Sequence, residues 1–264
     1  MPPPDSLDRV LDVRPLGDDR FALEVPSAWL QGRGAFGGLV VGAMLRAIAR
    51  AEPEVARAVR SVTAEIPAPV LPGEAVIEVT ALRRGAKVST LRATMLQGGE
   101  VVAQLVAVLG ARRPSPERWS ALPPPDARWR DTPPVPFIPG VTPEFARAFE
   151  YRNAGPAPFS GGEPRVEGWV RPSAPCEVRD AAWVAAVADA FWPTVLVSSD
   201  GPRATATIAF TMQVVHLPTT DDEPLCYRAT TPVLDDGYLV EFRELWTTSG
   251  QLVALNQQTF VIIR

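Results

Sequence analysis

The chain carries one pattern of turn and strand twice, and this repeat restricts its possible folds more than any other feature. The segments "GGEVVAQLVAVL" (98–109) and "SGQLVALNQQTF" (249–260) each combine a glycine turn with a strand pattern, and their aligned turns are 151 residues apart. The turns "RRGAK" (83–87) and "DDGYL" (235–239) align within one residue of the same offset. Agreement at several places in the same order predicts an internal duplication.

A helical segment is part of the same alignment. At the offset of 151 residues, "AFGGLVVGAML" (35–45) falls on "AVADAFWPTVL" (186–196), which sets Gly38 opposite Asp189. Apolar residues at helical spacing predict a helix over 37–51 in the first half.

The second half is expected to repeat this order of helix and strands. Asp180 is a candidate N-cap for a helix that runs to Phe191 and stops before Pro193. Alternating apolar and polar residues predict strands near 61–66, 74–82, 87–96 and 101–110, and again near 203–215, 225–232, 237–247 and 252–263. The second helix is apolar on all sides, so protein must surround it. A buried helix inside a long antiparallel sheet, present twice, is an α+β arrangement, although periodicity alone also allows two separate α+β domains.

A proline-rich segment separates the two halves. Residues 112–143 contain ten prolines, which remove backbone donors and disfavour both helices and central strands. We therefore divide the chain into an N-terminal unit (1–111), an extended connector (112–143) and a C-terminal unit (144–264). Large aromatic side chains in the connector are expected to hold it against the protein: Trp119, Trp129 and Phe137.

Charge and composition exclude several classes of function. A net charge of −4 and a pI near 5.2 argue against nucleic acid as a partner. The sequence has neither a signal-peptide pattern nor an uninterrupted apolar run of membrane-spanning length, so we expect a cytoplasmic protein with no membrane association. The only histidine, His216, and two distant cysteines, Cys176 and Cys226, cannot build a standard zinc site, and no glycine-rich phosphate loop follows a strand. We expect no metal and no cofactor.

One carboxylate stands out against its surroundings. Asp189 is the single charged residue in "AVADAFWPTV" (186–195), and burying an unpaired carboxylate is costly. Such a residue either has a structural partner in the protein or serves the chemistry of a site.

The ordered series of motifs resembles a known family. The first half contains "AFGGLVVGAMLRAIARA" followed by "SVTAEIPAPVLPGEAVIEVTALRRGAKVSTLRATMLQGGEVVAQ"; the second contains "DAAWVAAVADAF", "ATIAFTMQVVHLP" and "DDGYLVEFRELWTTSGQLVALNQQ". These segments are similar to the type II acyl-CoA thioesterases, in their divergent bacterial, thioesterase-like branch. The resemblance implies a double hotdog, in which each of two tandem hotdog repeats wraps a long antiparallel sheet around a central helix.

The resemblance also implies a reaction and its residues. In that family a water held by Asp, Thr and Gln hydrolyses an acyl-CoA thioester, and the matching residues are Asp189, Thr207 and Gln258. The adjacent Gln257 would point to the opposite strand face, so a register error of one residue exchanges the two glutamines. A histidine often found in the family's strand after "ATI" is absent, and Gln213 stands near its place. Chemically, a carboxylate in a dry site is a competent general base for this reaction.

Substrate contacts are expected from the first half. Gly37 and Gly38 let a helix N-terminus approach the ligand closely, and its N–H groups are suited to a developing oxyanion. The basic turn is a candidate for the CoA phosphates through Arg83, Arg84 and Lys87. In the second half, Phe191 and Trp192 stand beside the acid and are expected to narrow the acyl pocket.

Two functions from different classes remain open from the residues. One is an acyl-CoA thioesterase; the other is a non-catalytic double hotdog that binds acyl-CoA or an acylated carrier. Catalytic classes built on a hydratase Asp/His pair or on a G-x-S-x-G elbow lack their residues here. Exposed sheet edges and faces lead us to expect a homodimer or a higher homo-oligomer.

Overall fold

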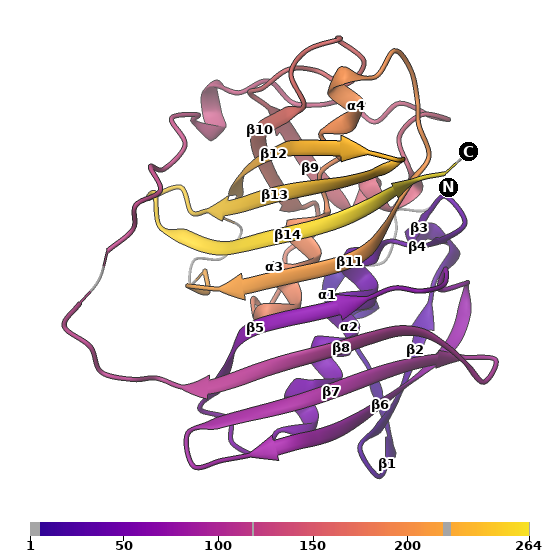
Figure 1. Ribbon diagram of the computed structural model, residues 1–264, viewed down its shortest axis with the longest axis vertical. Helices are drawn as coiled ribbons and strands as arrows, with labels where there is room; N and C mark the ends of the chain where they lie inside the picture. Colours follow the sequence, from indigo (N-terminus) through magenta and orange to yellow (C-terminus); the bar gives the residue numbers. More distant parts are fainter. Residues whose placement is uncertain (1–5, 118, 219–222, 264) are drawn as a thin grey trace.

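The computed structural model describes residues 6–117, 119–218 and 223–263. Twelve described strands form one antiparallel sheet in the order β1-β2-β6-β7-β8-β5-β11-β14-β13-β12-β10-β9. Two central helices lie behind this sheet in the view of Figure 1. The fold is an α+β double hotdog, as the sequence predicts.

Each half of the sheet encloses one central helix. In the first half the helix is α2 (Gly37–Ala51), and the strands are β1 (Arg14–Gly17), β2 (Arg20–Val25), β5 (Arg57–Glu65), β6 (Gly73–Arg84), β7 (Val88–Gln97) and β8 (Glu100–Ala111). In the second half the helix is α3 (Ala181–Asp189), and the strands are β9 (Phe149–Asn153), β10 (Arg165–Pro172), β11 (Thr205–Val214), β12 (Leu225–Asp235), β13 (Tyr238–Trp246) and β14 (Leu252–Ile262). Strands β5 and β11 pair antiparallel at the centre of the sheet and join the two halves.

Shorter elements complete the described chain. They are α1 (Leu7–Val10), η1 (Ser27–Trp29), β3 (Leu30–Gln31), β4 (Gly34–Ala35), η2 (Trp129–Asp131), η3 (Glu144–Ala148) and α4 (Val195–Ser198). Of the helices within the described ranges, none has the length and apolar character needed to span a membrane.

The sequence explains why the two central helices lie so close together. All nine residues of α3 are buried, and the Asp180 side chain caps the helix by accepting a hydrogen bond from the Trp183 N–H (3.0 Å). Where α2 contacts α3, its residue is a glycine, Gly38. A Cβ on Gly38 would lie 2.9 Å from the Cα of Ala186. Only small residues on both helices permit this approach, so the two helices share one core.

The predicted alignment of the helices is wrong, although the duplication holds for the strands. Helix α2 begins at Gly37 and α3 at Ala181, so Gly38 opens one helix whereas Asp189 closes the other. The reason is a difference in loop length: α2 is followed almost at once by β5, whereas residues 190–204, which include α4, separate α3 from β11. Because of this longer loop, the offset of about 151 residues applies to the strands that follow and not to the helices.

The connector packs against the second half over part of its length. Trp129 makes an edge-to-face contact with Trp169 (centroids 6.4 Å apart), and Arg147 lies over the Phe137 ring (3.5 Å). Trp119 is 87% exposed, so the expectation that it holds the connector in place is wrong. Strands β9 and β10, which the sequence analysis did not predict, form the edge of the sheet beneath this segment.

Candidate functional site

Asp189 is the last residue of α3, and its carboxylate is almost completely buried. Its Oδ1 atom accepts a hydrogen bond from Gln258 Nε2 (2.8 Å) and another from Arg243 Nη1 (3.2 Å). The backbone N–H of Gly38, at the start of α2, also donates to this carboxylate. The charged residue that the sequence isolates therefore has hydrogen-bond partners on strands β13 and β14 and on the opposite helix.

Gln258 is held in one orientation by a chain of hydrogen bonds. Asn256 donates through Nδ2 to the Thr211 carbonyl (2.8 Å), which leaves its Oδ1 to accept from Gln258 Nε2 (3.0 Å). With Nε2 fixed as the donor, Gln258 Oε1 accepts from the Thr207 hydroxyl (2.9 Å). Gln258 is completely buried whereas Gln257 is exposed, so the structure places Gln258 beside Asp189.

A β-bulge brings Thr207 into this network. Phe210 and Met212 on β11 point inward, so strict alternation would turn Thr207 toward the outer face. The pairing of β11 with β14 shifts between Thr207 and Ala209, which leaves the residue between them unpaired and reverses the alternation. Thr207 therefore lies on the inner face beside Gln258.

The environment of Asp189 disfavours its charged form. Desolvation raises the pKa of Asp189 above its ordinary value, while the Arg243 cation and the hydrogen bonds from Gln258 and Gly38 lower it. Desolvation is the largest of these effects, and the nearby Glu241 carboxylate raises the pKa further. A carboxylate with a raised pKa is a stronger base than one in water.

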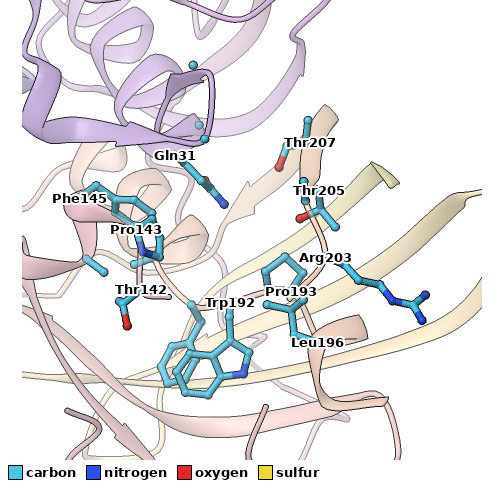
Figure 2. A pocket seen from close by; sticks show the side chains of 18 of the residues that line it. Gln31, Thr142, Pro143, Phe145, Trp192, Pro193, Leu196, Arg203, Thr205 and Thr207 are labelled. Atoms are coloured by element: carbon cyan, nitrogen blue, oxygen red, sulfur yellow. The ribbon is translucent and has the colours of Figure 1, made fainter. Parts of the chain in front are cut away.

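A large apolar cavity adjoins the network. Its volume is about 1380 Å³. Its wall contains Gly37, which adjoins Asp189 Oδ2, and Thr207, which donates to Gln258. Asp189 and Gln258 themselves are not among the described lining residues and lie directly behind this wall. Figure 2 shows Thr205 and Thr207 of β11 on one side of this space, with Phe145 and Pro143 across from them and Trp192 below. The wall also contains Phe191, so both aromatic residues that follow Asp189 line the cavity.

The two adjacent glycines at the start of α2 have different surroundings. A Cβ on Gly37 would lie 2.8 Å from Asp189 Oδ2, and Gly37 lines the cavity. Gly38 instead faces α3 and gives its N–H to Asp189. The missing side chain of Gly37 thus leaves space on the cavity side of the carboxylate.

The basic turn predicted for the CoA phosphates lies away from this cavity. Arg84 donates to the carbonyl of Ala51, the last residue of α2, whereas Asp189 lies at the first turn of that helix. The helix between these ends has fifteen residues, a length of about 22 Å. Arg83, Arg84 and Lys87 are absent from the described cavity wall, and in Figure 1 their hairpin lies at the lower left, opposite the start of β11.

Other arginines line the cavity that the sequence analysis did not single out. Arg33, Arg147 and Arg203 are part of its wall, and no Asp or Glu is among the described lining residues. Arg147 pairs with Glu144 (2.9 Å) and Arg203 with Asp200 (3.6 Å), while Arg33 is exposed. Nothing in the local sequence marks these residues, because they come from two loops and the 3₁₀ helix η3, which only the fold brings together.

The remaining polar candidates lie outside the site. Gln213 is exposed on the outer face of β11, and His216 follows the end of that strand. The described residues contain no cluster of three or more His, Cys, Asp or Glu side chains suited to a metal ion. Both cysteines are buried and unpaired, and burial raises the pKa of the Cys176 thiol to about 11.

A buried ion pair on β13 was not predicted from the sequence. Arg243 and Glu241 occupy inward positions of β13, where Leu239 and Leu245 are their apolar neighbours. The alternation in "YLVEFRELW" (238–246) was the available signal, because it puts two charges on the face that should be apolar.

The fold and this site define a double-hotdog protein with an Asp–Gln–Thr network beside an acyl-sized apolar cavity. The family models agree: the acyl-CoA thioesterase N-terminal domain matches residues 25–110, and the acyl-CoA thioesterase C-terminal domain matches residues 121–262. The chain belongs to the acyl-CoA thioesterase family, and it is a thioester hydrolase.

Solved structures share this fold over nearly the whole chain. A conserved hotdog-fold protein of unknown function from Alicyclobacillus acidocaldarius is 26% identical, with a TM-score of 0.89 and coverage of 98% of both chains. A proposed thioesterase II from Thermobifida fusca is 23% identical, with a TM-score of 0.84 and coverage of 98% of this chain and 97% of that one. The acyl-CoA thioesterase II TesB2 from Mycobacterium marinum is 19% identical, with a TM-score of 0.78 and coverage of 98% of both. Comparison with curated proteins finds no match.

Proposed function

We propose that this protein hydrolyses an acyl-CoA thioester to a free acid and CoA, with Asp189 as the general base. The observation that carries the proposal is the unequal environment of the two carboxylate oxygens. Oδ1 is occupied by Gln258 and Arg243, whereas Oδ2 adjoins Gly37 in the cavity wall. We infer that a water on the Gly37 side of the cavity reaches Oδ2, the oxygen to which neither of these side chains donates.

In this mechanism the water gives one proton to Asp189 Oδ2 and donates its other hydrogen to the Thr207 hydroxyl oxygen. The Thr207 hydroxyl proton is already committed to Gln258, so its oxygen is free to accept. The water oxygen then bonds to the thioester carbonyl carbon. Collapse of the tetrahedral intermediate breaks the C–S bond, and the proton held by Asp189 passes to the departing thiolate.

The developing oxyanion needs a hydrogen-bond donor that Asp189 does not use. Gly38 N–H is bound to the carboxylate, but Gly37 opens α2 and its N–H has no partner within the helix. Because Gly37 lines the cavity, we assign its N–H to the oxyanion.

The lining of the cavity suits a substrate with a hydrophobic acyl chain and an anionic CoA part. Aromatic side chains such as Phe145 and Trp192 suit the acyl chain, while a wall with arginines and no acidic residue suits phosphates. We propose Arg33, Arg147 and Arg203 as the residues closest to the CoA phosphates. Contact of CoA with the distant turn at 83–87 stays a separate prediction.

Thiol release from a panel of acyl-CoA substrates tests the proposal. Wild-type protein should release CoA from at least one of them, and Asp189→Asn should lower turnover by about 10² or more, because it removes the base while keeping the shape. Thr207→Val and Gln258→Ala should give smaller losses, since each positions the water or the base.

Two controls separate catalysis from folding. Gln257→Ala changes the neighbouring exposed glutamine and should leave turnover unchanged. Asp189→Asn should retain its melting temperature and its affinity for a non-hydrolysable thioether analogue of acyl-CoA. Full activity of Asp189→Asn would refute this mechanism, and tight binding without turnover in the wild type would favour the non-catalytic binding protein.

A further inference from the structure

The Arg243–Glu241 ion pair is a costly polar feature of the buried core, and it adjoins the Asp189 network. Both side chains are essentially inaccessible to water, with exposed fractions of 1% for Arg243 and 0% for Glu241. Their contact is short, with Arg243 Nε donating to Glu241 Oε1 at 2.6 Å. Buried ion pairs are often no more stabilising than apolar residues of similar volume, so stability alone does not account for this one.

Arg243 reaches Asp189 and the end of its helix at the same time. Nη1 donates to the Ala188 carbonyl (2.9 Å) and to Asp189 Oδ1 (3.2 Å). A cation there satisfies a terminal carbonyl of α3 and offsets the unfavourable placement of an aspartate at a helix C-terminus. The same guanidinium therefore fixes the backbone and the side chain of residue 189.

Glu241 accepts a hydrogen bond from a chain segment that continues the cavity wall. Its Oε2 atom accepts from the Thr194 N–H (2.6 Å), and Oε1 also receives the Tyr227 hydroxyl (3.4 Å). Thr194 directly follows Trp192 and Pro193, which line the cavity. The pair thus links the carboxylate to the chain segment that forms the acyl pocket.

The charges of the pair act on Asp189 in opposite directions. Arg243 favours the ionised carboxylate, whereas Glu241 disfavours it and also neutralises part of the Arg243 charge. Two further titratable groups face this position: Tyr151 on β9 and Tyr227 on β12, whose pKa values burial raises well above the ordinary value, so both stay neutral. Arg243 and Glu241 are therefore the charged groups that set the balance.

We propose that Arg243 and Glu241 are positioning residues of the hydrolytic reaction. Arg243 holds Oδ1 of Asp189 so that Oδ2 faces the cavity, and Glu241 shares the Arg243 charge so that Asp189 remains basic enough to accept a proton from water. The inference rests on the proposed role of Asp189 as the base.

The test is the pH dependence of kcat/KM for an acyl-CoA that the wild type hydrolyses. Activity requires ionised Asp189, so kcat/KM falls as the pH drops through the pKa of that group. Removing the cation with Arg243→Met should move this acid limb to higher pH, by about one to three units for a close opposite charge. Glu241→Gln should move it to lower pH and lower the plateau rate, because the base becomes weaker.

Opposite shifts are the result that a purely structural role does not produce. The far end of α2 offers a matched pair, Arg57 and Glu52 (3.1 Å, both largely buried), so Arg57→Met and Glu52→Gln should leave the acid limb in place. Where Arg243→Met does not fold, Arg243→Lys keeps the charge without the planar fork, and should keep the limb near wild type while lowering kcat. Unmoved limbs in folded Arg243 and Glu241 variants, or shifts in the same direction, overturn the inference.

A second readout separates this inference from the proposed function. Infrared titration of the carboxyl band that disappears in Asp189→Asn reports the pKa of Asp189 without substrate, and it should shift in the same opposite directions. If Asp189→Asn is inactive but neither variant shifts that band, the positioning role fails and the base role stands. If Asp189→Asn is fully active, the base role fails, and the inference fails with it.

Discussion

The two glycines at the start of α2 have different roles, one beside the Asp189 carboxylate and the other in helix packing. Gly37 and Gly38 are neighbours in sequence, yet a Cβ on Gly37 would meet only the side chains of Asp189 and Ile66, whereas one on Gly38 would meet the backbone of α3 and the Phe36 ring. The first glycine keeps the space beside the carboxylate open, and the second lets two helices touch.

This difference predicts opposite outcomes for the same substitution. Gly37→Ala should lower turnover strongly, because its methyl group occupies the space at Asp189 Oδ2, while stability stays near wild type since alanine favours helix by up to about 1 kcal/mol. Gly38→Ala should destabilise the fold by roughly 1–3 kcal/mol, because the α3 backbone cannot move away easily. Thermal unfolding and steady-state turnover on both variants check this. Equal losses of stability would contradict the assignment.

At the scale of the element, α3 is a short helix with an aspartate at each end. Asp180 at the N-terminus caps the helix and pairs with Arg46 (2.9 Å), and its charge agrees with the helix dipole. Asp189 at the C-terminus opposes the dipole and needs Arg243 beside it. The helix thus has a stabilising acid at one end and the proposed general base at the other.

Separate substitutions of Asp180 distinguish its cap from its ion pair. Asp180→Ala should lower the free energy of unfolding by about 1 kcal/mol, because the Trp183 N–H loses its acceptor. Asp180→Asn retains a capping oxygen, and Arg46 retains Asp8 (3.3 Å), so its loss should be smaller. Urea unfolding measures both, with Asp200→Ala as an exposed control. An Asn variant as unstable as the Ala variant would show that the ion pair matters more than the cap.

At the scale of the whole molecule, the continuous sheet leaves one broad outer face. Tyr238 and Phe242 alternate along the outside of β13 and are each about half exposed, and Leu255 and Val261 lie partly buried on the adjacent β14. Exposed apolar side chains gathered on one face are typical of association surfaces.

We therefore predict a homodimer or higher oligomer that uses this face. Light scattering coupled to size exclusion should give at least twice the 28.5 kDa of one chain, and Phe242→Glu should shift the protein toward the monomer, because a charge would be buried at the contact. Val55→Glu, at a fully exposed position outside the sheet, is the matched control. A mass of 28.5 kDa at every concentration would contradict the prediction.

Local pattern determined much of this protein. Helical spacing predicted α2 with its observed bounds, and the Asp180 cap predicted the start of α3. The alternation of apolar and polar residues located the eight strands that follow the two helices. Asp189 stood out because a lone carboxylate in an apolar helix is costly wherever it is buried. These features depend on neighbours a few residues apart, which is the range that periodicity reports.

Only the tertiary structure decided the composition of the site. A bulge in β11 turns Thr207 inward, against its local alternation, and pairing across the sheet makes Gln258 the buried glutamine. Arg243 and Glu241 act on Asp189 across about fifty residues of chain, and the cavity arginines come from two loops and the 3₁₀ helix η3. Contacts at such distances depend on strand pairing and helix packing, which the whole fold fixes. The alternation along β13 indicates only that two charges are buried, and does not indicate which group they contact.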